Sequence, residues 1–159
     1  MAQATVIRPA ALDERHALEE LQRRASLVHD AYRQSLIDHP EAIDLPEELI
    51  RAGCVWVAER DGRRLGFAVV LPRGAGQAEL DGLFVEPDTW RQGTARALVA
   101  RAMAKARDDG ASTLHVVAAP EALDFYRRCG FEQVGEEPTR FGLALLMRAQ
   151  VPDPKSDRS

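Results

Sequence analysis

The sequence has 159 residues, 45% of them hydrophobic, and this length and composition predict one globular domain rather than a disordered chain. The 21 basic and 25 acidic residues give a net charge of −4, which excludes the strong positive field that draws nucleic acid or an anionic membrane. The sequence shows neither a run of about 18 apolar residues nor a signal-peptide pattern, so we expect a cytoplasmic protein without nucleic-acid or membrane partners.

The first third of the chain predicts one strand followed by helices. Residues 5–8 form a β-rich segment, and Asp13 is a candidate helix N-cap. Apolar residues between Leu18 and Ile37 recur at spacings of three and four, with a break after Val28, which predicts two helices or one bent helix. A further brief helix is expected at residues 46–51.

The middle of the chain changes to strands. Residues 54–59 and 65–71 flank the tight-turn pair Asp61-Gly62 and predict an antiparallel hairpin, to which residues 78–85 add a third strand after a turn at residues 73–76. Apolar positions from Ala95 to Ala106 then mark one face of a helix that Gly110 ends, and residues 114–118 form the next strand. This strand, helix and strand predict a parallel pair with a right-handed crossover.

The last third predicts a short helix at residues 121–129 and closing strands at 131–135 and 141–148. The fold class is therefore α+β, with a mixed, mostly antiparallel central sheet of about six to seven strands flanked by helices and one parallel βαβ unit. We expect residues 1–150 to form a single domain. The polar, proline-containing residues 151–159 are expected to be a flexible tail.

The loop between the third meander strand and the long helix suits an anion. Backbone N–H groups at a helix start lack intrahelical partners and the helix dipole is positive there, so a diphosphate fits. Gly93 and Ala95 are small enough for close approach, and Arg91 and Arg96 add positive charge. An ordinary strand-to-helix connection with two solvated arginines has the same residues, so the loop alone leaves both interpretations open.

Two segments resemble the GNAT superfamily of acetyl-CoA-dependent N-acetyltransferases. After a strand end of V-x-P type, the family has Gln or Arg, two residues, Gly, one residue, and Gly or Ala; here Gly93 and Ala95 match, and Trp90 stands at the Gln/Arg position. Residues 119–131, APEALDFYRRCGF, look like the family's N-x-x-A-x-x-F-Y-x-x-x-G-F, with Ala119 in place of Asn. The resemblance covers nearly the whole chain and implies the GNAT-like fold with acetyl-CoA as cosubstrate.

The resemblance also implies which residues bind the cofactor. The backbone of Leu83 and Val85 is expected to pair with the pantetheine arm as an added strand, with the Leu83 N–H meeting the oxyanion of the tetrahedral intermediate. The full expected set is Leu83, Phe84, Val85, Arg91, Gln92, Gly93, Thr94, Ala95, Arg96, Ala119 and Tyr126.

Three residues are candidates for proton transfer. Tyr126 matches the family's general acid toward the leaving thiolate; the alternative is a packing aromatic. Glu79 stands where the histone-acetyltransferase branch has its glutamate base, and Asp81 lies on the same strand face and is the alternative carboxylate. Since an ordinary glutamate pKa is about 4.3, base action needs burial that raises the pKa or a water relay. Solvated strand carboxylates are the competing interpretation.

The cysteines and histidines do not have the spacing of a metal site, and we predict none. Cys54 and Cys129 are expected to be buried thiols. Surface or structural roles are expected for the four histidines, His16, His29, His39 and His115.

The resulting functional hypothesis is an N-acetyltransferase that moves an acetyl group from acetyl-CoA to a primary amine by direct attack in a ternary complex. The alternative is a catalytically silent acyl-CoA-binding module that acts as a sensor or interaction protein. Acidic residues suit a cationic acceptor, either a small molecule or a protein amino group. The acceptor's identity and any preference for another acyl-CoA stay open, and an edge strand near the carboxyl terminus suits a homodimer.

Overall fold

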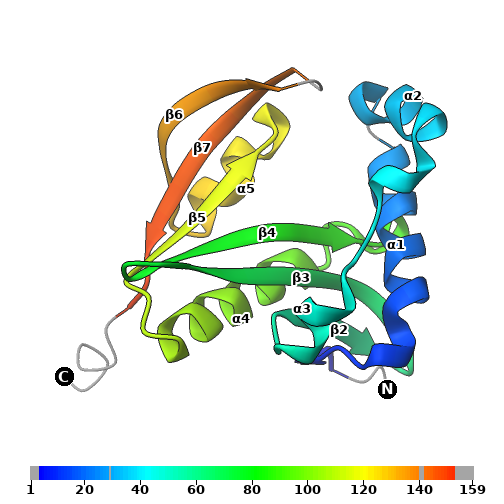
Figure 1. Ribbon diagram of the computed structural model, residues 1–159, viewed down its shortest axis with the longest axis horizontal. Coiled ribbons are helices and arrows are strands. Elements are labelled where there is room, and N and C mark those ends of the chain that lie inside the picture. The colour runs from blue at the N-terminus through cyan, green and yellow to red at the C-terminus, as the bar shows by residue number, and fades with distance from the viewer. Residues whose placement is uncertain (1–3, 29, 140–141, 153–159) are drawn as a thin grey trace. The chain divides into compact units, whose positions relative to one another are not determined.

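The computed structural model describes residues 4–28, 30–139 and 142–152. Seven strands in this part of the chain form one sheet with the order β1-β2-β3-β4-β5-β7-β6 (Figure 1). Their bounds are β1 Val6–Pro9, β2 Val55–Arg60, β3 Arg63–Gly74, β4 Gln77–Val85, β5 Thr113–Ala118, β6 Glu132–Thr139 and β7 Gly142–Gln150. The α-helices are α1 Arg15–Leu27, α2 Asp30–Asp38, α3 Glu47–Arg51, α4 Thr94–Asp108 and α5 Leu123–Arg128. The predicted α+β class is confirmed.

The chain divides into two compact units. The first comprises residues 1–69 and 82–98, and the second comprises residues 70–81 and 99–159. Three elements, β3, β4 and α4, have residues in both units.

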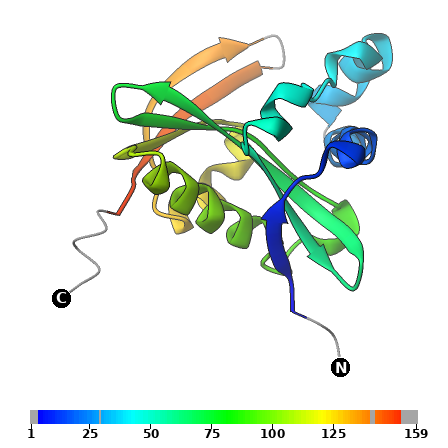
Figure 2. The same ribbon diagram turned by 60° about the horizontal axis from the view of Figure 1, so that its bottom comes forward.

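In the first unit, β1 and β3 pair with opposite edges of β2, both antiparallel. The hairpin turn predicted at Asp61-Gly62 is present, and both residues have positive φ, as a tight hairpin turn requires. Apolar side chains of β2 and β3, such as Val57 and Phe67, are fully buried together with Leu18 of α1. The path from β1 through a short 3-10 turn into α1 can be followed in Figure 2.

The start of α1 differs from the prediction. A 3-10 turn at Leu12–Glu14 precedes the helix, and no side chain caps α1 at its N-cap residue, Glu14. Asp13 is therefore not the cap. The carboxylate of Glu14 instead accepts a hydrogen bond from the backbone N–H of Ala11 at 2.9 Å, because the chain turns back there before the helix begins.

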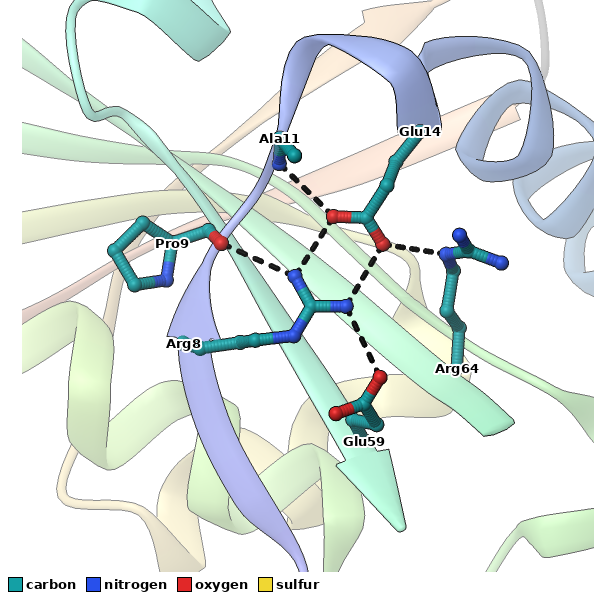
Figure 3. Close-up of polar contacts among 6 residues, drawn as sticks. All are labelled: Arg8, Pro9, Ala11, Glu14, Glu59 and Arg64. Carbon is teal, nitrogen blue, oxygen red and sulfur yellow. Dashed lines mark hydrogen bonds and ion pairs between the residues drawn. The ribbon is translucent and has the colours of Figure 1, made fainter. Parts of the chain in front are cut away.

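The buried Glu14 is also the centre of an ion-pair cluster whose other members are partly exposed (Figure 3). The two terminal nitrogens of the Arg8 guanidinium, Nη1 and Nη2, donate to its carboxylate at 2.7 and 2.8 Å, and Nε of Arg64 donates to it as well. Arg8 also donates to Glu59 at 3.2 Å. The hydrogen bonds from Arg8, opposed in part by burial, lower the pKa of Glu14 to about 2.

In the second unit, β4 and β5 are the parallel pair that the sequence predicted, with Gln77–Leu80 opposite Thr113–Val116. β5 pairs antiparallel with β7 along its whole length (Figure 1). β7 also pairs antiparallel with β6, and these two strands lie side by side in both ribbon views (Figures 1 and 2). Alternate residues are buried on one face, and they include Leu80, Leu114, Val116, Met147 and Ala149.

Two strands are longer than predicted. β3 continues to Gly74, through part of the expected turn, and β6 continues from Glu132 to Thr139 although its last residues are polar and exposed. Ladder hydrogen bonds to β7 maintain the end of β6 without burying side chains, so hydrophobic patterning does not detect it. Residues 153–159 of the expected tail lie outside the described residues.

Among the residues that the structure describes, no helix combines the length and the apolar character needed to cross a membrane.

The Glu14 cluster predicts a measurable stability change. Replacing Glu14→Gln removes the charge that holds Arg8 and Arg64, and we expect the free energy of unfolding to fall by about 2 kcal/mol at pH 7. Because the native pKa of Glu14 is depressed from 4.5, its stabilising effect is complete above pH 4.5 and is lost as the pH falls toward about 2. Urea denaturation between pH 7 and pH 2 measures both effects.

The matched control is Glu20→Gln, since Glu20 is exposed and its ion pair with Arg24 is long, at 3.9 Å. An exposed pair of this kind contributes less than about 0.5 kcal/mol. Equal destabilisation by the two substitutions would contradict a special role for Glu14.

Candidate functional site

The loop between β4 and α4 ends at a helix start with free amides. Arg91 and Gly93 both have left-handed backbone conformations, with φ of 68° and 84°, and α4 begins at Thr94. The first helical hydrogen bond of α4 runs from the N–H of Ala97 to the carbonyl of Gly93. The three N–H groups in between, on Thr94, Ala95 and Arg96, therefore have no acceptor within the helix. This arrangement suits an anion.

Arg91 is a strained residue in this loop, because a non-glycine residue with positive φ is uncommon. Hydrogen bonds hold the preceding turn in place. The N–H and the hydroxyl of Thr89 both donate to the carbonyl of Glu86 at 2.9 Å, and the Glu86 N–H donates to Leu65 of β3 at 2.7 Å. The end of β4 is thus fixed before the chain enters the left-handed turn.

Ion pairs hold the same loop from other elements of the first unit. The buried carboxylate of Glu86 accepts a hydrogen bond from Nε of Arg24 at 2.8 Å and lies 3.5 Å from Nη2 of Arg63. Arg63 also donates to Asp88, and this hydrogen bond lowers the pKa of Asp88. Arg60 donates to the side chain of Gln92 at 2.8 Å. Sequence reasoning missed these contacts, since Arg60 and Arg63 could be assigned to the hairpin but not to this loop.

Trp90, at the position where the GNAT pattern has Gln or Arg, makes a contact that bears on the predicted pantetheine site. Its indole Nε1 donates to the carbonyl of Val85 at 3.0 Å, and its side chain is partly exposed. A carbonyl oxygen has two lone pairs, so Val85 keeps one acceptor position for another partner.

The end of β4 beside this loop packs closely against Gly66 of β3, where a larger side chain would clash. A Cβ on Gly66 of β3 would lie 2.6 Å from the carbonyl oxygen of Phe84. The ring of Phe84 lies 5.3 Å from that of Phe67 between centroids, and Leu83 is half-buried like Phe84. Close backbone approach therefore positions the segment predicted to pair with the cofactor.

Thr94, the first residue of α4, carries an enclosed hydroxyl. The residue is only 3% exposed, and among the described residues its Oγ1 has no hydrogen-bond partner. A buried polar group without a partner costs free energy, typically about 1–3 kcal/mol. The hydroxyl lies at the helix start, in the same turn as the free amides.

The predicted carboxylates lie on β4 in the second unit. Glu79 is half-buried and Asp81 is exposed, while Ala78 and Leu80 between and before them are buried, so the alternation expected for a half-buried strand is present. The β4–β5 ladder ends at Leu80, although β5 continues past its partner Val116 to Ala118. Asp81 therefore follows the last residue of β4 that β5 pairs with.

Tyr126 lies in α5 and is 6% exposed. Its ring contacts those of Phe125 and Phe131 edge to face, at centroid distances of 5.1 and 5.3 Å. Burial, and to a smaller extent the nearby Cys129, raises the pKa of the Tyr126 phenol above its usual value. The phenol therefore stays protonated at neutral pH, as a general acid must, but it is a weaker acid than a free tyrosine.

Other predicted residues also have definite places. Ala119 is half-buried and precedes the turn that leads into α5, and its carbonyl accepts the N–H of Ala122 at 2.9 Å. Cys54 is buried as predicted, whereas Cys129 is only half-buried because it follows the end of α5. Within the described part of the chain, no group of three or more His, Cys, Asp or Glu residues could hold a metal.

The histidines differ from one another. The side chain of His16 is 91% exposed, as a surface residue is, and His29 lies outside the described residues. His115 is half-buried on β5, where its register partners are Glu79 of β4 and Arg148 of β7. Sequence reasoning did not connect His115 with Glu79, since their pairing depends on the strand register rather than on any motif.

The structure thus divides the predicted site residues between the two units. Glu79, Asp81, Ala119 and Tyr126 lie in the second unit. The first unit contains Leu83, Phe84, Val85, Arg91, Gln92, Gly93, Thr94, Ala95 and Arg96.

Comparisons with known proteins give two relatives in sequence, solved structures of the same fold and a matching family model. The rat protein N-acetyltransferase family 8 member 3 (Rattus norvegicus) is 32% identical over 108 residues, which are 62% of this chain and 47% of that protein. Human N-acetyltransferase 8 (Homo sapiens) is 32% identical over 94 residues, which are 54% of this chain and 41% of that protein. The chain therefore spans less than half the length of these two curated relatives.

A solved structure of PaiA N-acetyltransferase from Thermoplasma acidophilum, in complex with coenzyme A, superposes with a TM-score of 0.78 at 16% identity and covers 93% of this chain and 99% of that one. This likeness shows the fold. The sequence model of the family described as "Acetyltransferase (GNAT) domain" matches residues 51–133, more than half of the chain, and includes the loop and α5. With the free amides at the start of α4, the β4–β5 parallel pair and this match, the chain belongs to the GNAT family of acetyltransferases.

Proposed function

We propose that this protein is an N-acetyltransferase that transfers the acetyl group of acetyl-CoA to a primary amine by direct attack in a ternary complex. The observation that carries the proposal is the helix start at residues 93–96, where free amides follow a left-handed turn within the region that matches the family. The coenzyme A in the PaiA complex, and the names of the two curated relatives, support the same cosubstrate and reaction.

The cofactor roles follow from the chemistry of the loop. The diphosphate accepts hydrogen bonds from the amides of Gly93, Thr94, Ala95 and Arg96, with the exposed Arg91 and Arg96 adding positive charge. Gln92 positions Arg60 beside the loop. The pantetheine amides add to the backbone of Leu83 and Val85 as a further strand, and Ala119 supplies backbone groups because it has no polar side chain.

The chemical step needs a proton acceptor, a stabilised oxyanion and a proton donor. Glu79 takes a proton from the ammonium nitrogen of the acceptor, and the neutral nitrogen that remains attacks the thioester carbon. The N–H of Leu83 stabilises the resulting oxyanion. Collapse of the intermediate breaks the carbon–sulfur bond, and Tyr126 gives its phenolic proton to the leaving thiolate. The second proton that the nitrogen loses as the amide forms restores the Tyr126 phenol. Asp81, which is exposed, attracts the cationic amine or replaces Glu79 as the acceptor of the proton.

The acceptor class follows from charge. The two carboxylates of β4 and the net charge of −4 favour an amine that arrives as a cation. A small molecule and a protein amino group both meet this requirement.

Thr94 tests the loop. Replacing Thr94→Val keeps the shape of the side chain and removes a hydroxyl that has no partner among the residues that the structure describes, so the free energy of unfolding should not fall. We expect the Thr94 hydroxyl to donate to the diphosphate once the cofactor is bound. CoA binding should then weaken by about tenfold to a hundredfold, because a hydrogen bond to a charged group contributes about 1.5–3 kcal/mol. Calorimetric titration with CoA measures the affinity.

Thr89→Val is the matched control, since Thr89 is equally buried but its hydroxyl is bonded to Glu86. This variant should lose about 1 kcal/mol of stability and keep more CoA affinity than Thr94→Val. Unchanged CoA affinity in Thr94→Val would remove its hydroxyl from the site.

Trp90 reports on the pantetheine arm. If the arm pairs with Val85, the environment of the indole that donates to the same carbonyl changes, so the tryptophan emission should shift when CoA is added. The shift should persist in Trp56→Phe and disappear in Trp90→Phe. A shift that survives in Trp90→Phe would place the arm away from Val85.

Tyr126→Phe tests turnover. Free thiol release from acetyl-CoA with a panel of amines should be slower by about one to three orders of magnitude in this variant, because a general acid contributes about 10²–10⁴-fold. CoA affinity and the unfolding midpoint should change little, since the ring contacts remain. Parallel losses of binding and rate would identify a structural tyrosine. Tight CoA binding by the unmodified protein without turnover of any amine would identify the silent acyl-CoA-binding module.

A further inference from the structure

One face of the second unit carries a row of polar side chains across neighbouring strands. Glu79 on β4 is the register partner of His115 on β5, and His115 is the register partner of Arg148 on β7. Directly paired residues of adjacent strands point to the same side of a sheet. The residues before and after them, such as Leu114 and Val116, are buried on the opposite side. His115 therefore lies beside the predicted base.

The imidazole of His115 has an unused nitrogen. Its Nε2 is enclosed, and among the described residues it has no hydrogen-bond partner. A buried ring nitrogen left without a partner is costly, and such groups are rare enough in proteins to need an explanation. A role in accepting or passing a proton supplies one.

The groups around the ring keep it neutral. Burial has the largest effect and lowers the pKa of His115, and the positive charges of Arg73 on β3 and Arg148 on β7 lower it further. Glu79 opposes them by favouring the charged ring. Glu132 of β6 pairs with Arg148 at 3.4 Å and offsets part of its charge. A neutral imidazole keeps one nitrogen free to accept a proton at pH 7.

We propose that His115 is a positioning residue that acts through Glu79, by accepting the proton that Glu79 takes from the amine. This inference rests on the proposed acetyltransferase function. The N–H bond of the attacking amine breaks and an O–H bond forms on Glu79. That O–H bond then breaks as an N–H bond forms on His115, which restores the carboxylate. Since Nε2 is enclosed, the imidazolium finally releases a proton to solvent from its other ring nitrogen, Nδ1.

The first experiment measures the pair without turnover. NMR titration of protein with labelled histidine, assigned with His115→Gln, gives the titration midpoint of His115 in the unmodified protein and in Glu79→Gln. The midpoint should lie below 6.5 and should fall further in Glu79→Gln, because the carboxylate that favours the imidazolium is removed. An identical midpoint in the two proteins would overturn the proposed coupling.

The second experiment measures kcat/KM against pH with acetyl-CoA and an accepted amine. His115→Gln should be about tenfold slower at pH 7 with unchanged CoA affinity, and its acid limb should lie at lower pH than that of the unmodified protein. Since His115 acts through Glu79, the double variant should be no slower than Glu79→Gln alone. His16→Gln, the same change at an exposed histidine, should match the unmodified protein.

The outcomes separate the inference from the function on which it rests. If the unmodified protein turns over and His115→Gln has the same rate and pH profile, the inference is wrong and the acetyltransferase function stands. If the losses of kcat/KM in Glu79→Gln and His115→Gln add in the double variant, His115 does not act through Glu79 and the inference is likewise wrong. If no amine in the panel is acetylated by the unmodified protein, the proposed function fails, and the proton transfer from Glu79 to His115 fails with it.

Discussion

Two parallel strands cannot be joined by a tight turn, and this constraint determines where the chain has a helix start with free amides. The connection from β4 to β5 has to be a crossover, and here it is α4. A helix that follows a strand in this way begins with amides that the helix itself cannot satisfy. The free amides, on which the proposed diphosphate site rests, are thus a property of the backbone path. Trp90 at the usual Gln/Arg position is compatible with it, because no side chain at that position is needed to supply the amides.

Arginine–glutamate pairs hold the elements of the first unit in place. Two buried glutamates each bind two arginines: Glu14 binds Arg8 and Arg64, and Glu86 binds Arg24 and Arg63. Arg63 and Arg64 are adjacent on β3, and each reaches a different glutamate because successive side chains of a strand point to opposite faces. Burying such charges is expensive unless every partner is in place, so these pairs favour one geometry over near alternatives.

The sequence was a good guide to local structure and to the residues within motifs. Period-two and helical spacing, the Asp61-Gly62 turn and the glycine after α4 are properties of neighbouring residues, and the hairpin, α4 and the parallel pair were predicted from them. The contacts of Trp90 with Val85 and of Arg60 with Gln92 were not predicted, because side-chain direction at a loop is not a property of spacing. The proximity of His115 to Glu79 depends on register, which hydrophobic patterning leaves undetermined at the level of individual pairs. Neither the sequence motifs nor the fold identifies the amine acceptor.

The alternation along the strands of the second unit has a consequence for how the protein can change over time. Residues such as Leu80, Val116 and Met147 hold the interior, while Glu79, His115 and Arg148 occupy the other face of the same strands. A mutation on the polar face leaves the packed layer intact, because the two sets of side chains do not share volume. Substitutions at these polar positions can therefore accumulate one at a time while the protein stays folded, which would let the proposed acetyltransferase change its amine acceptor in single steps.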